Sequence, residues 1–158
     1  MNLDSIKQKL QNNAIFYSEE KILEKPTIIG YDKKFKWSWM ATQLNTFIVV
    51  SNFESTPITI DKIEEHLNLS FNYAEKHYSG WPRGLQSGIG VISVLISDSI
   101  EKDAKEYCTH LKSSKKWAGF TIPVVVHAST NEFFFFNKYP IWGRVYYPYF
   151  KKLILSLK

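Results

Sequence analysis

The stretch GIGVISVLI, residues 88–96, decides the fold together with FTIPVVVHA, residues 120–128. Both runs are almost continuously apolar, which is typical of strands that are buried on both faces of a sheet. Apolar residues recur at helical spacing between Ile100 and Leu111, so this segment predicts a crossover helix between two strands. The turn-forming residues 129–131 and the run EFFFF, residues 132–136, then predict a β-hairpin.

The segments on either side predict further strands and helices that cover this unit. Asn2 is placed to cap an amphipathic helix, and Asp98 with Glu101 fits a capping box for the helix that follows. These further elements are helices at 3–10, 61–78 and 140–158 (the last divided or kinked at Pro148) and strands at 27–31, 35–39 and 46–52, with a turn at 32–34. We therefore expect an α/β (or α+β) fold in which a mixed central sheet of about five or six strands has helices on both faces.

The composition is that of one globular domain with many aromatic residues. Of the 158 residues, 44% are hydrophobic, 22% are charged and 16% are aromatic. This length suits one domain, so residues 1–158 are predicted to form it, with residues 1–25 as a helix and a charged connection packed on its edge. Most aromatic side chains are expected in the core, which leaves some for an exposed contact surface.

The net charge of +5 permits weak attraction to anions, and no long basic run concentrates this charge. The chain starts without an apolar leader, and no segment has the roughly 18 apolar residues that span a bilayer. We therefore predict a cytoplasmic protein without a membrane partner. The single Cys108 excludes an internal disulfide and a Cys-rich metal site. His66 and His77 lie too far apart on one predicted helix to share a metal ion and are interpreted as surface residues, with a groove that they flank together with Tyr73 as the alternative.

The carboxyl ends of the predicted strands gather the polar residues that a small enzyme would need. Ligands of open α/β sheets bind beyond these ends, where we expect Glu54, Asp98 and His127 to meet. The two carboxylates would act as acid and base or share a divalent ion, and Ser55 or Ser129 would complete a Ser-His-Asp set. No G-x-S-x-G elbow precedes either serine. The sequence therefore shows no evident catalytic constellation, and a hydrolase or metal-assisted enzyme is the alternative.

The loop SGWPRGLQSG, residues 79–88, is the best candidate for recognition. An Arg between Pro and Gly offers a bidentate donor to a carboxylate or phosphate, and a nearby Trp offers a flat apolar surface. The alternative is a structural loop in which the Gly residues turn the chain and the Trp fills the core. The predicted ligand-binding residues are therefore Trp81, Arg83 and Gln86 in this loop, with Glu54, Asp98 and His127 at the strand ends.

From residue 46 onward, the order strand, helix, strand, helix, strand, strand, helix resembles the thioredoxin fold. Ile122-Pro123-Val124 is similar to that family's proline at the start of its third strand, where the peptide bond is cis. The family's Cys-x-x-Cys would fall within residues 52–57, where this chain has Asn-Phe-Glu-Ser-Thr-Pro. The resemblance therefore implies a fold without thiol redox chemistry.

The first half of the chain is similar in element order to the restriction-endonuclease-like fold. Enzymes of that fold bind magnesium through an Asp and an Asp/Glu-x-Lys on adjacent strands. Asp32 would be the first carboxylate, but residues 46–52 contain no acidic residue and no Lys, and Glu19-x-Lys21 precedes Asp32. The resemblance therefore implies no active nuclease of this type.

Two aromatic segments suggest further partners. Lys and aromatic residues alternate within residues 33–39, a combination of charge and stacking surface that would suit a weak single-strand nucleic-acid binder. Phe133–Phe136 need cover on both faces of a strand, which predicts a homodimer through this run and the C-terminal aromatic residues. We rank a non-catalytic binding or interaction module first, with a small anionic ligand or a protein as its partner and with no metal or other cofactor.

Overall fold

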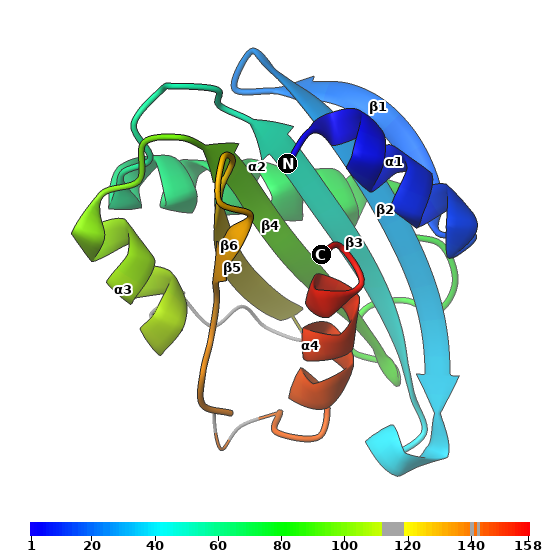
Figure 1. Cartoon of the computed structure of the whole chain (residues 1–158). Coiled ribbons are helices and arrows are strands. Elements are labelled where there is room, and N and C mark those ends of the chain that lie inside the picture. Colours follow the sequence, from blue (N-terminus) through cyan, green and yellow to red (C-terminus); the bar gives the residue numbers. More distant parts are fainter. Residues whose placement is uncertain (112–118, 140, 142) are drawn as a thin grey trace.

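All six strands of the computed structural model belong to one sheet, and neighbours in the sheet follow the order of the chain (Figure 1). The structure describes residues 1–111, 119–139, 141 and 143–158. The helices are α1 (Leu3–Asn12), α2 (Ile60–His77), α3 (Lys102–His110) and α4 (Tyr147–Leu155), with a 3-10 helix, η1, at Trp37–Trp39. The strands are β1 (Phe16–Ile22), β2 (Lys25–Lys36), β3 (Thr42–Asn52), β4 (Ser87–Ser97), β5 (Gly119–His127) and β6 (Glu132–Phe134).

The sheet combines two kinds of strand pairing. β1, β2 and β3 form an antiparallel meander, whereas β3, β4 and β5 are parallel, and β6 returns antiparallel to β5. Parallel neighbours need a long connection, and α2 and α3 lie in the two connections of this sheet. The predicted α/β fold with a mixed central sheet is therefore confirmed.

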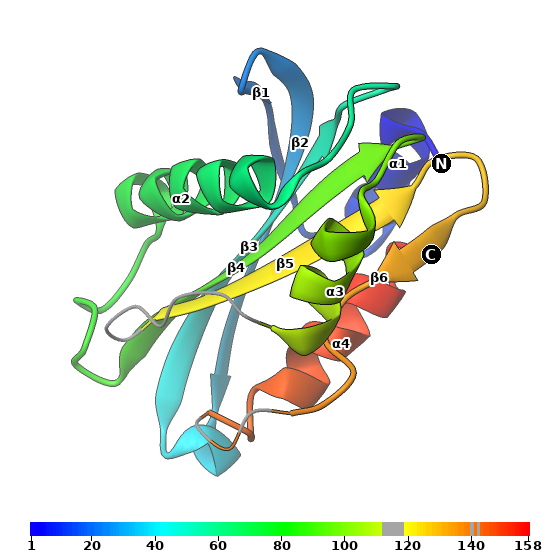
Figure 2. The ribbon, with the colours of Figure 1, turned by 90° about the vertical axis from the view of Figure 1, so that its left-hand side faces the viewer.

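Helices cover both faces of the sheet (Figure 2). α1 and α4 pack on one face, and α2 and α3 pack on the other. Neighbouring residues of β3 point to opposite faces, so Ile48 joins the α1/α4 core and Phe47 joins the α2 core. A Cβ atom on Gly90 would lie 2.7 Å from Phe150 Cε1 of α4. The close approach of α4 to β4 therefore requires glycine at this position.

The predicted helix caps have mixed outcomes. The Asn2 side chain accepts a hydrogen bond from the Ser5 N–H at 2.9 Å, which confirms the cap of α1. The capping box of α3 is wrong, because Glu101 is the N-cap residue and makes no capping bond with its side chain. The Asp98 carboxylate instead accepts from Ser129, in the turn after β5. Pro148 lies in the first turn of α4, where a missing N–H costs nothing.

The N-terminal half differs most from the prediction. Residues 16–22, which were assigned largely to a charged connection, form the edge strand β1. An edge strand tolerates charges such as Glu19 and Glu20 because only one side of it is paired. The turn predicted at 32–34 is also absent, since β2 continues to Lys36 and stays paired with β3. Backbone pairing along the whole ladder outweighs the local preference of Asp and Lys for a turn.

The alternation predicted for residues 35–39 ends at Lys36, where η1 begins. A 3-10 helix has about three residues per turn, so residues two apart no longer share a face. Trp39 therefore turns into the core and is 2% exposed, whereas Trp37 is 81% exposed. The predicted strand at 35–39 would have placed Phe35, Trp37 and Trp39 on one side, because side chains two residues apart in a strand share a face, and this placement is wrong.

The four consecutive Phe residues are covered within one chain. β6 ends at Phe134, so the predicted last strand is shorter than expected. Phe133 and Phe135 pack against the α1/α4 core, whereas Phe134 packs against the α2/α3 core. The protein's own core layers thus pack against both sides of the Phe run, for which a second subunit had been expected. The homodimer stays a prediction.

Two expectations about the remaining chain can be compared with the structure. No peptide bond between the described residues is cis, so Pro123 lacks the cis bond that the thioredoxin resemblance implied. Of the helix predicted at 140–158, residues 140 and 142 lie outside the described residues, and the α-helical part is 147–155. Within the described part of the chain, the helices are too short or too polar to cross a membrane.

Candidate functional site

The parallel strands give the sheet two distinct ends. We call the end where β3, β4 and β5 begin the amino end and the opposite one the carboxyl end. The predicted ligand-binding residues divide between them, with Trp81, Arg83 and Gln86 at the amino end and Glu54, Asp98 and His127 at the carboxyl end. β4, which separates the two groups, has 11 residues. At about 3.3 Å per residue the two groups lie roughly 30 Å apart and cannot form one site.

At the carboxyl end, Asp98 and Ser129 are bonded directly to each other. The hydroxyl and the N–H of Ser129 both donate to the Asp98 carboxylate, the N–H at 3.0 Å. His127 Nδ1 accepts from the Thr130 N–H at 3.4 Å. The carbonyl of Glu54 accepts from the Asp98 N–H at 2.9 Å. The structure thus brings Asp98, Ser129 and His127 together. Glu54 joins them only through its backbone carbonyl, which contacts the Asp98 N–H.

The order of these bonds differs from that of a Ser-His-Asp triad. In a triad the His accepts the serine proton and donates to the Asp, whereas here Ser129 donates to Asp98 without a His between them. The hydrogen bond from the Ser129 hydroxyl lowers the pKa of Asp98, so this exposed carboxylate stays ionised at neutral pH. An ionised, solvated carboxylate is a poor general acid. No three His, Cys, Asp or Glu side chains of the described residues gather as a metal site.

A buried polar network under α2 was missed by the sequence analysis. His66 is fully buried rather than on the surface, and its ring contacts Ser51 Oγ at 2.7 Å and Ser93 Oγ at 2.6 Å. The Thr27 hydroxyl extends the network to β2 through Ser51 at 2.6 Å. Burial lowers the pKa of His66 to about 3, so the ring is neutral. Because α2 covers this network, it acts as a structural support. Ser51 and Ser93 within apolar strands were its sequence signal.

Three segments meet at the amino end. Trp39 Nε1 donates to the Val145 carbonyl at 3.2 Å, which connects η1 to the segment before α4. The rings of Phe35 and Trp81 lie 6.4 Å apart at 74°, which connects β2 to the loop before β4. The corner between β2 and β3, the loop at residues 79–86 and the segment at residues 143–146 therefore form one continuous surface.

A cavity of about 320 Å³ opens between these segments. The Gln43 N–H donates to the Gln86 carbonyl at 2.8 Å, which holds the loop against β3 at the cavity. The lining is mixed, with apolar walls and polar side chains: Met40, Thr42, Leu44, Gly84, Gln86, Ser87, Gly88, Phe120 and Tyr146. This volume lies at the lower limit for small-molecule sites and suits an apolar group of modest size.

Large apolar side chains are exposed around this cavity. Met40 is 85% exposed beside the exposed Trp37, and Leu85 of the loop is 67% exposed. Apolar groups that are clustered in this way mark contact surfaces more often than scattered ones do. Eight of the eleven large hydrophobic side chains that are exposed among the described residues lie in segments that reach this end: Phe35, Trp37, Met40, Trp81, Leu85, Tyr139, Ile141 and Val145.

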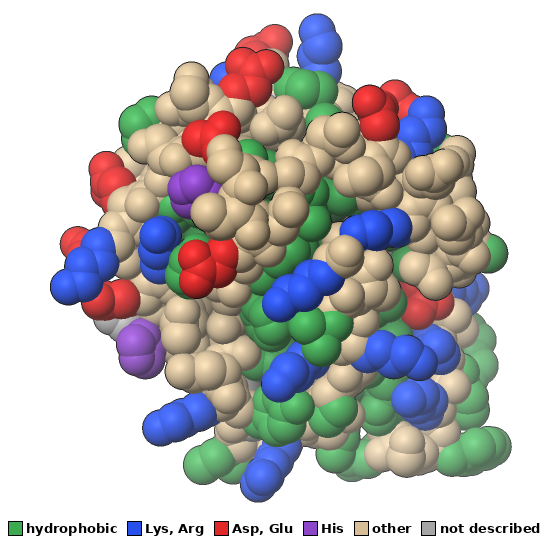
Figure 3. All heavy atoms as spheres, viewed as in Figure 1, with side chains coloured by type: hydrophobic (Ala, Val, Ile, Leu, Met, Phe, Trp, Pro, Cys, Tyr) green, Lys and Arg blue, Asp and Glu red, His purple; other side chains and the backbone are tan. Residues whose placement is uncertain are grey.

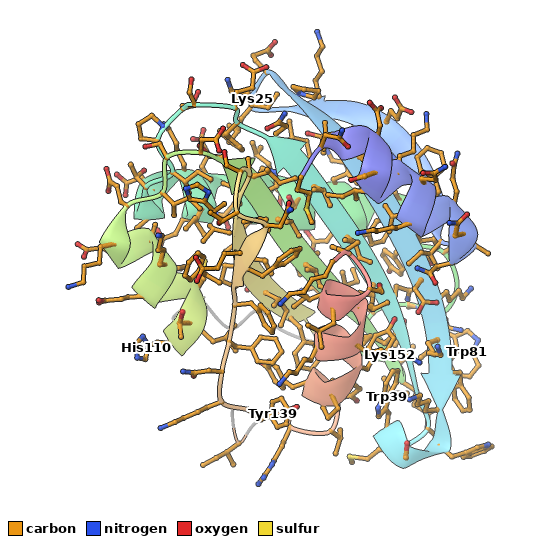
Figure 4. All side chains as sticks on the ribbon, in the orientation of Figure 1. Lys25, Trp39, Trp81, His110, Tyr139 and Lys152 are labelled. Atoms are coloured by element: carbon orange, nitrogen blue, oxygen red, sulfur yellow. The ribbon has the colours of Figure 1, made fainter. Side chains whose placement is uncertain are left out.

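Positive charge gathers at the same end. Residues 33–53, 76–97 and 133–158 include the segments that meet at this end and contain ten Lys or Arg and no Asp or Glu. Lys158 among them lies against Phe133 at the carboxyl end, and Glu75, just before the second segment, pairs with Arg83. Figure 3 shows Lys and Arg side chains among hydrophobic ones in the lower part of the molecule, and Figure 4 labels Trp39, Tyr139 and Lys152 there, with Lys25 at the opposite end. We define the apolar-basic surface as the eight exposed hydrophobic residues above together with Lys36, Lys138, Arg144, Lys151 and Lys152.

The three predicted residues of the loop differ in their surroundings. Gln86 is exposed and lines the cavity, and Trp81 is half exposed beside Phe35. Arg83 is held by α2, because its guanidinium pairs with Glu75 and lies 5.4 Å from the centre of the Phe71 ring. Trp81 and Gln86 therefore belong to the surface around the cavity. Arg83 mainly fixes the loop to α2.

The sequence analysis missed the basic residues of the last segment as site residues. Arg144 and Lys138 are far apart from Lys36 in the chain, and only the fold gathers them. The signal that would have found them is the absence of acidic residues from three separate segments. A scan against protein-family models and searches of the curated proteins and of the solved structures found no match to the chain.

Proposed function

We propose that this protein is a non-catalytic binding module whose apolar-basic surface binds a partner that carries negative charge. The observation that carries the proposal is the concentration of exposed apolar side chains and basic side chains at the amino end. Removing the apolar side chains from water would supply affinity, and the positive charge would attract and orient an anionic partner.

The chemistry of the carboxyl end supports binding rather than catalysis. Asp98 and Ser129 are bonded to each other in an exposed turn, and the pKa of Asp98 is shifted away from the range in which a carboxyl group donates protons at neutral pH. Catalytic carboxyl groups are usually desolvated and shifted upward when they act as acids. An enzyme that uses Asp98, Glu54 and His127 is for these reasons the second candidate.

The test uses three defined anionic probes: a Glu-rich peptide, a single-stranded oligothymidylate, and vesicles that contain phosphatidylserine. Binding is measured at low salt and at physiological salt for the wild type and for Arg144→Glu/Lys152→Glu. We expect at least one probe to bind and the double reversal to weaken that binding about tenfold or more, because each probe is attracted by the basic side chains.

The matched control is Lys21→Glu/Lys102→Glu, which reverses the same number of charges at positions outside the apolar-basic surface. Both of these Lys side chains are exposed and lie outside the amino end. The control is expected to change binding by less than about twofold, because contact charges act more strongly than distant ones. Failure of all three probes to bind, or equal weakening by both double variants, would show that the surface is not a specific binding site.

A further inference from the structure

The cavity at the amino end identifies the partner more closely than net charge does. Its volume of about 320 Å³ is small, and its walls combine the apolar side chains of Leu44, Phe120 and Tyr146 with polar atoms. Sites of this size take one compact group rather than an extended cofactor. The basic residues lie around it on the surrounding surface, not in its walls. The occupant therefore needs an apolar group at its centre and negative charge beside it.

The polar part of the lining argues against a lipid surface as the occupant. Thr42, Gln86 and Ser87 line the cavity beside Met40. Hydrocarbon placed over the Thr42 hydroxyl and the Gln86 amide would remove them from water without a hydrogen-bond partner, which is costly, whereas the buried Ser87 hydroxyl already accepts from Asn45 Nδ2. A peptide offers an N–H and a C=O at nearly every residue, so it can bind these groups while a side chain fills the cavity.

The aromatic rings of the surface argue against a single-stranded nucleic acid. Phe35 and Trp37 lie edge to face at 84°, and Phe35 and Trp81 do so at 74°. Binding of successive bases uses ring faces that are open for stacking. Here neighbouring rings stand at steep angles to one another and present no row of parallel faces, which suits the side chains of a polypeptide better.

The charge around the cavity selects the flanking residues of such a peptide. Lys36 is exposed at the corner between β2 and η1, and its Nζ lies 4.8 Å from the centre of the Trp39 ring. Arg144 is exposed two residues before Tyr146, which lines the cavity, and Lys152 is exposed in the last turn of α4. Carboxylates that flank a central apolar side chain would therefore meet basic groups on the surface beside the cavity.

We infer that the cavity bounded by Thr42, Gln86 and Phe120 takes a large apolar side chain from a protein segment in which Asp or Glu residues flank that side chain. This inference rests on the proposed function, since it names the partner of the same surface. The apolar anchor supplies the affinity by burial, and the flanking carboxylates supply attraction and register through the surrounding Lys and Arg side chains.

The test uses a series of fluorescein-labelled nine-residue peptides with two Glu on each side of a variable central residue. The central residue is Phe, Leu, Ala or Lys, and fluorescence anisotropy gives the dissociation constants with the intact protein. We expect the Phe and Leu peptides to bind about tenfold or more tightly than the Ala peptide, because only they fill the cavity. The Lys peptide is expected to bind no better than the Ala peptide.

Two variants test whether the central side chain of the peptide binds in the cavity. Thr42→Trp and, independently, Gln86→Trp would fill the cavity from two different elements, and both should reduce the affinity for the Phe peptide to that for the Ala peptide. Leu69→Trp, at an exposed position on the outer side of α2, is the matched control and should leave the preference for Phe unchanged. Circular dichroism and thermal unfolding of each variant verify that it is folded.

The outcomes separate this inference from the proposed function. Peptide binding that ignores the central residue, or that survives both filling variants, would overturn the anchor while leaving an anion-binding surface. Binding of the oligothymidylate or of phosphatidylserine vesicles, lost in Arg144→Glu/Lys152→Glu, combined with no binding of any acidic peptide, would overturn the peptide partner alone. Failure of every anionic probe would overturn both proposals.

Discussion

At the carboxyl end of the sheet, Asp98 and Ser129 satisfy each other, whereas at the amino end Trp37 and Met40 extend almost fully into solvent. The first arrangement contains the residue types of an active site, and the second contains none of them. A polar cluster whose hydrogen bonds are all made within the protein needs no ligand. Covering exposed apolar side chains with a partner, in contrast, lowers the free energy of the system. Whether a cluster is satisfied thus indicates function better than its residue types do.

The largest effect is expected from two neighbouring Trp residues at the amino end. Trp39→Ala should lower the free energy of unfolding by about 3–5 kcal/mol, because it leaves a cavity in the core and an unpaired Val145 carbonyl. Trp37→Ala should change it by less than about 0.5 kcal/mol, since Trp37 is exposed. Urea unfolding of both variants measures the difference. Equal losses would mean that Trp37 belongs to the fold and is not available to a partner.

The second prediction concerns pH and the buried His66 network under α2. His66 has a pKa of about 3 in the folded protein and about 6.5 when unfolded, so below pH 6.5 the unfolded chain takes up a proton that the folded chain does not. Stability is therefore complete above pH 6.5 and should fall toward pH 3 by at most about 1.4 kcal/mol per pH unit. Urea unfolding at a series of pH values measures this slope.

His66→Gln supplies the comparison for the pH measurement, because it removes the titrating ring and keeps hydrogen-bonding groups near Ser51 and Ser93. The variant is expected to be less stable at neutral pH and to have a shallower slope between pH 6.5 and 4. Parallel slopes for the variant and the wild type would show that the pKa of His66 is not lowered in the folded protein. His77→Gln, at an exposed position of the same helix, should behave like the wild type.

The smallest effect is expected from Asp98→Asn at the carboxyl end. The side chain is exposed and the amide oxygen can still accept from Ser129, so the urea midpoint should not change measurably. Binding of the anionic probe that the wild type prefers should change by less than about twofold, because this turn lies roughly 30 Å from the apolar-basic surface. Loss of that binding in Asp98→Asn would reverse the roles that we assign to the two ends.

The central strands could be predicted from the sequence because they are buried on both faces. The apolar runs around Val91 and Val124 fit only strands that are buried on both faces. The helices α2 and α3, which precede these strands, have clear apolar stripes. The edge strand β1 was missed because a strand with one paired edge and charged residues such as Glu19 lacks that pattern. η1 was missed because two Trp residues separated by Ser also fit an alternating strand.

The candidate site could be predicted only in part. Gly and Pro mark the loop that contains Trp81 and Gln86, and Gln86 lines the cavity; the binding role of both residues stays a prediction. Arg144 and Lys152 were not selected, since nothing in the local sequence shows that the start of α4 lies beside η1. The burial of His66 was missed because its partners are hydroxyl groups of distant strands.

The agreement between strand order and chain order has a consequence for biosynthesis. Each strand pairs with the one that precedes it, so the sheet can assemble progressively as the chain leaves the ribosome. The α2/α3 layer can close during this growth. The other layer cannot, because α4 is the last described element and its Phe150 must reach Gly90. The nascent protein therefore carries one open apolar face until synthesis of α4, and this face is where a chaperone would act.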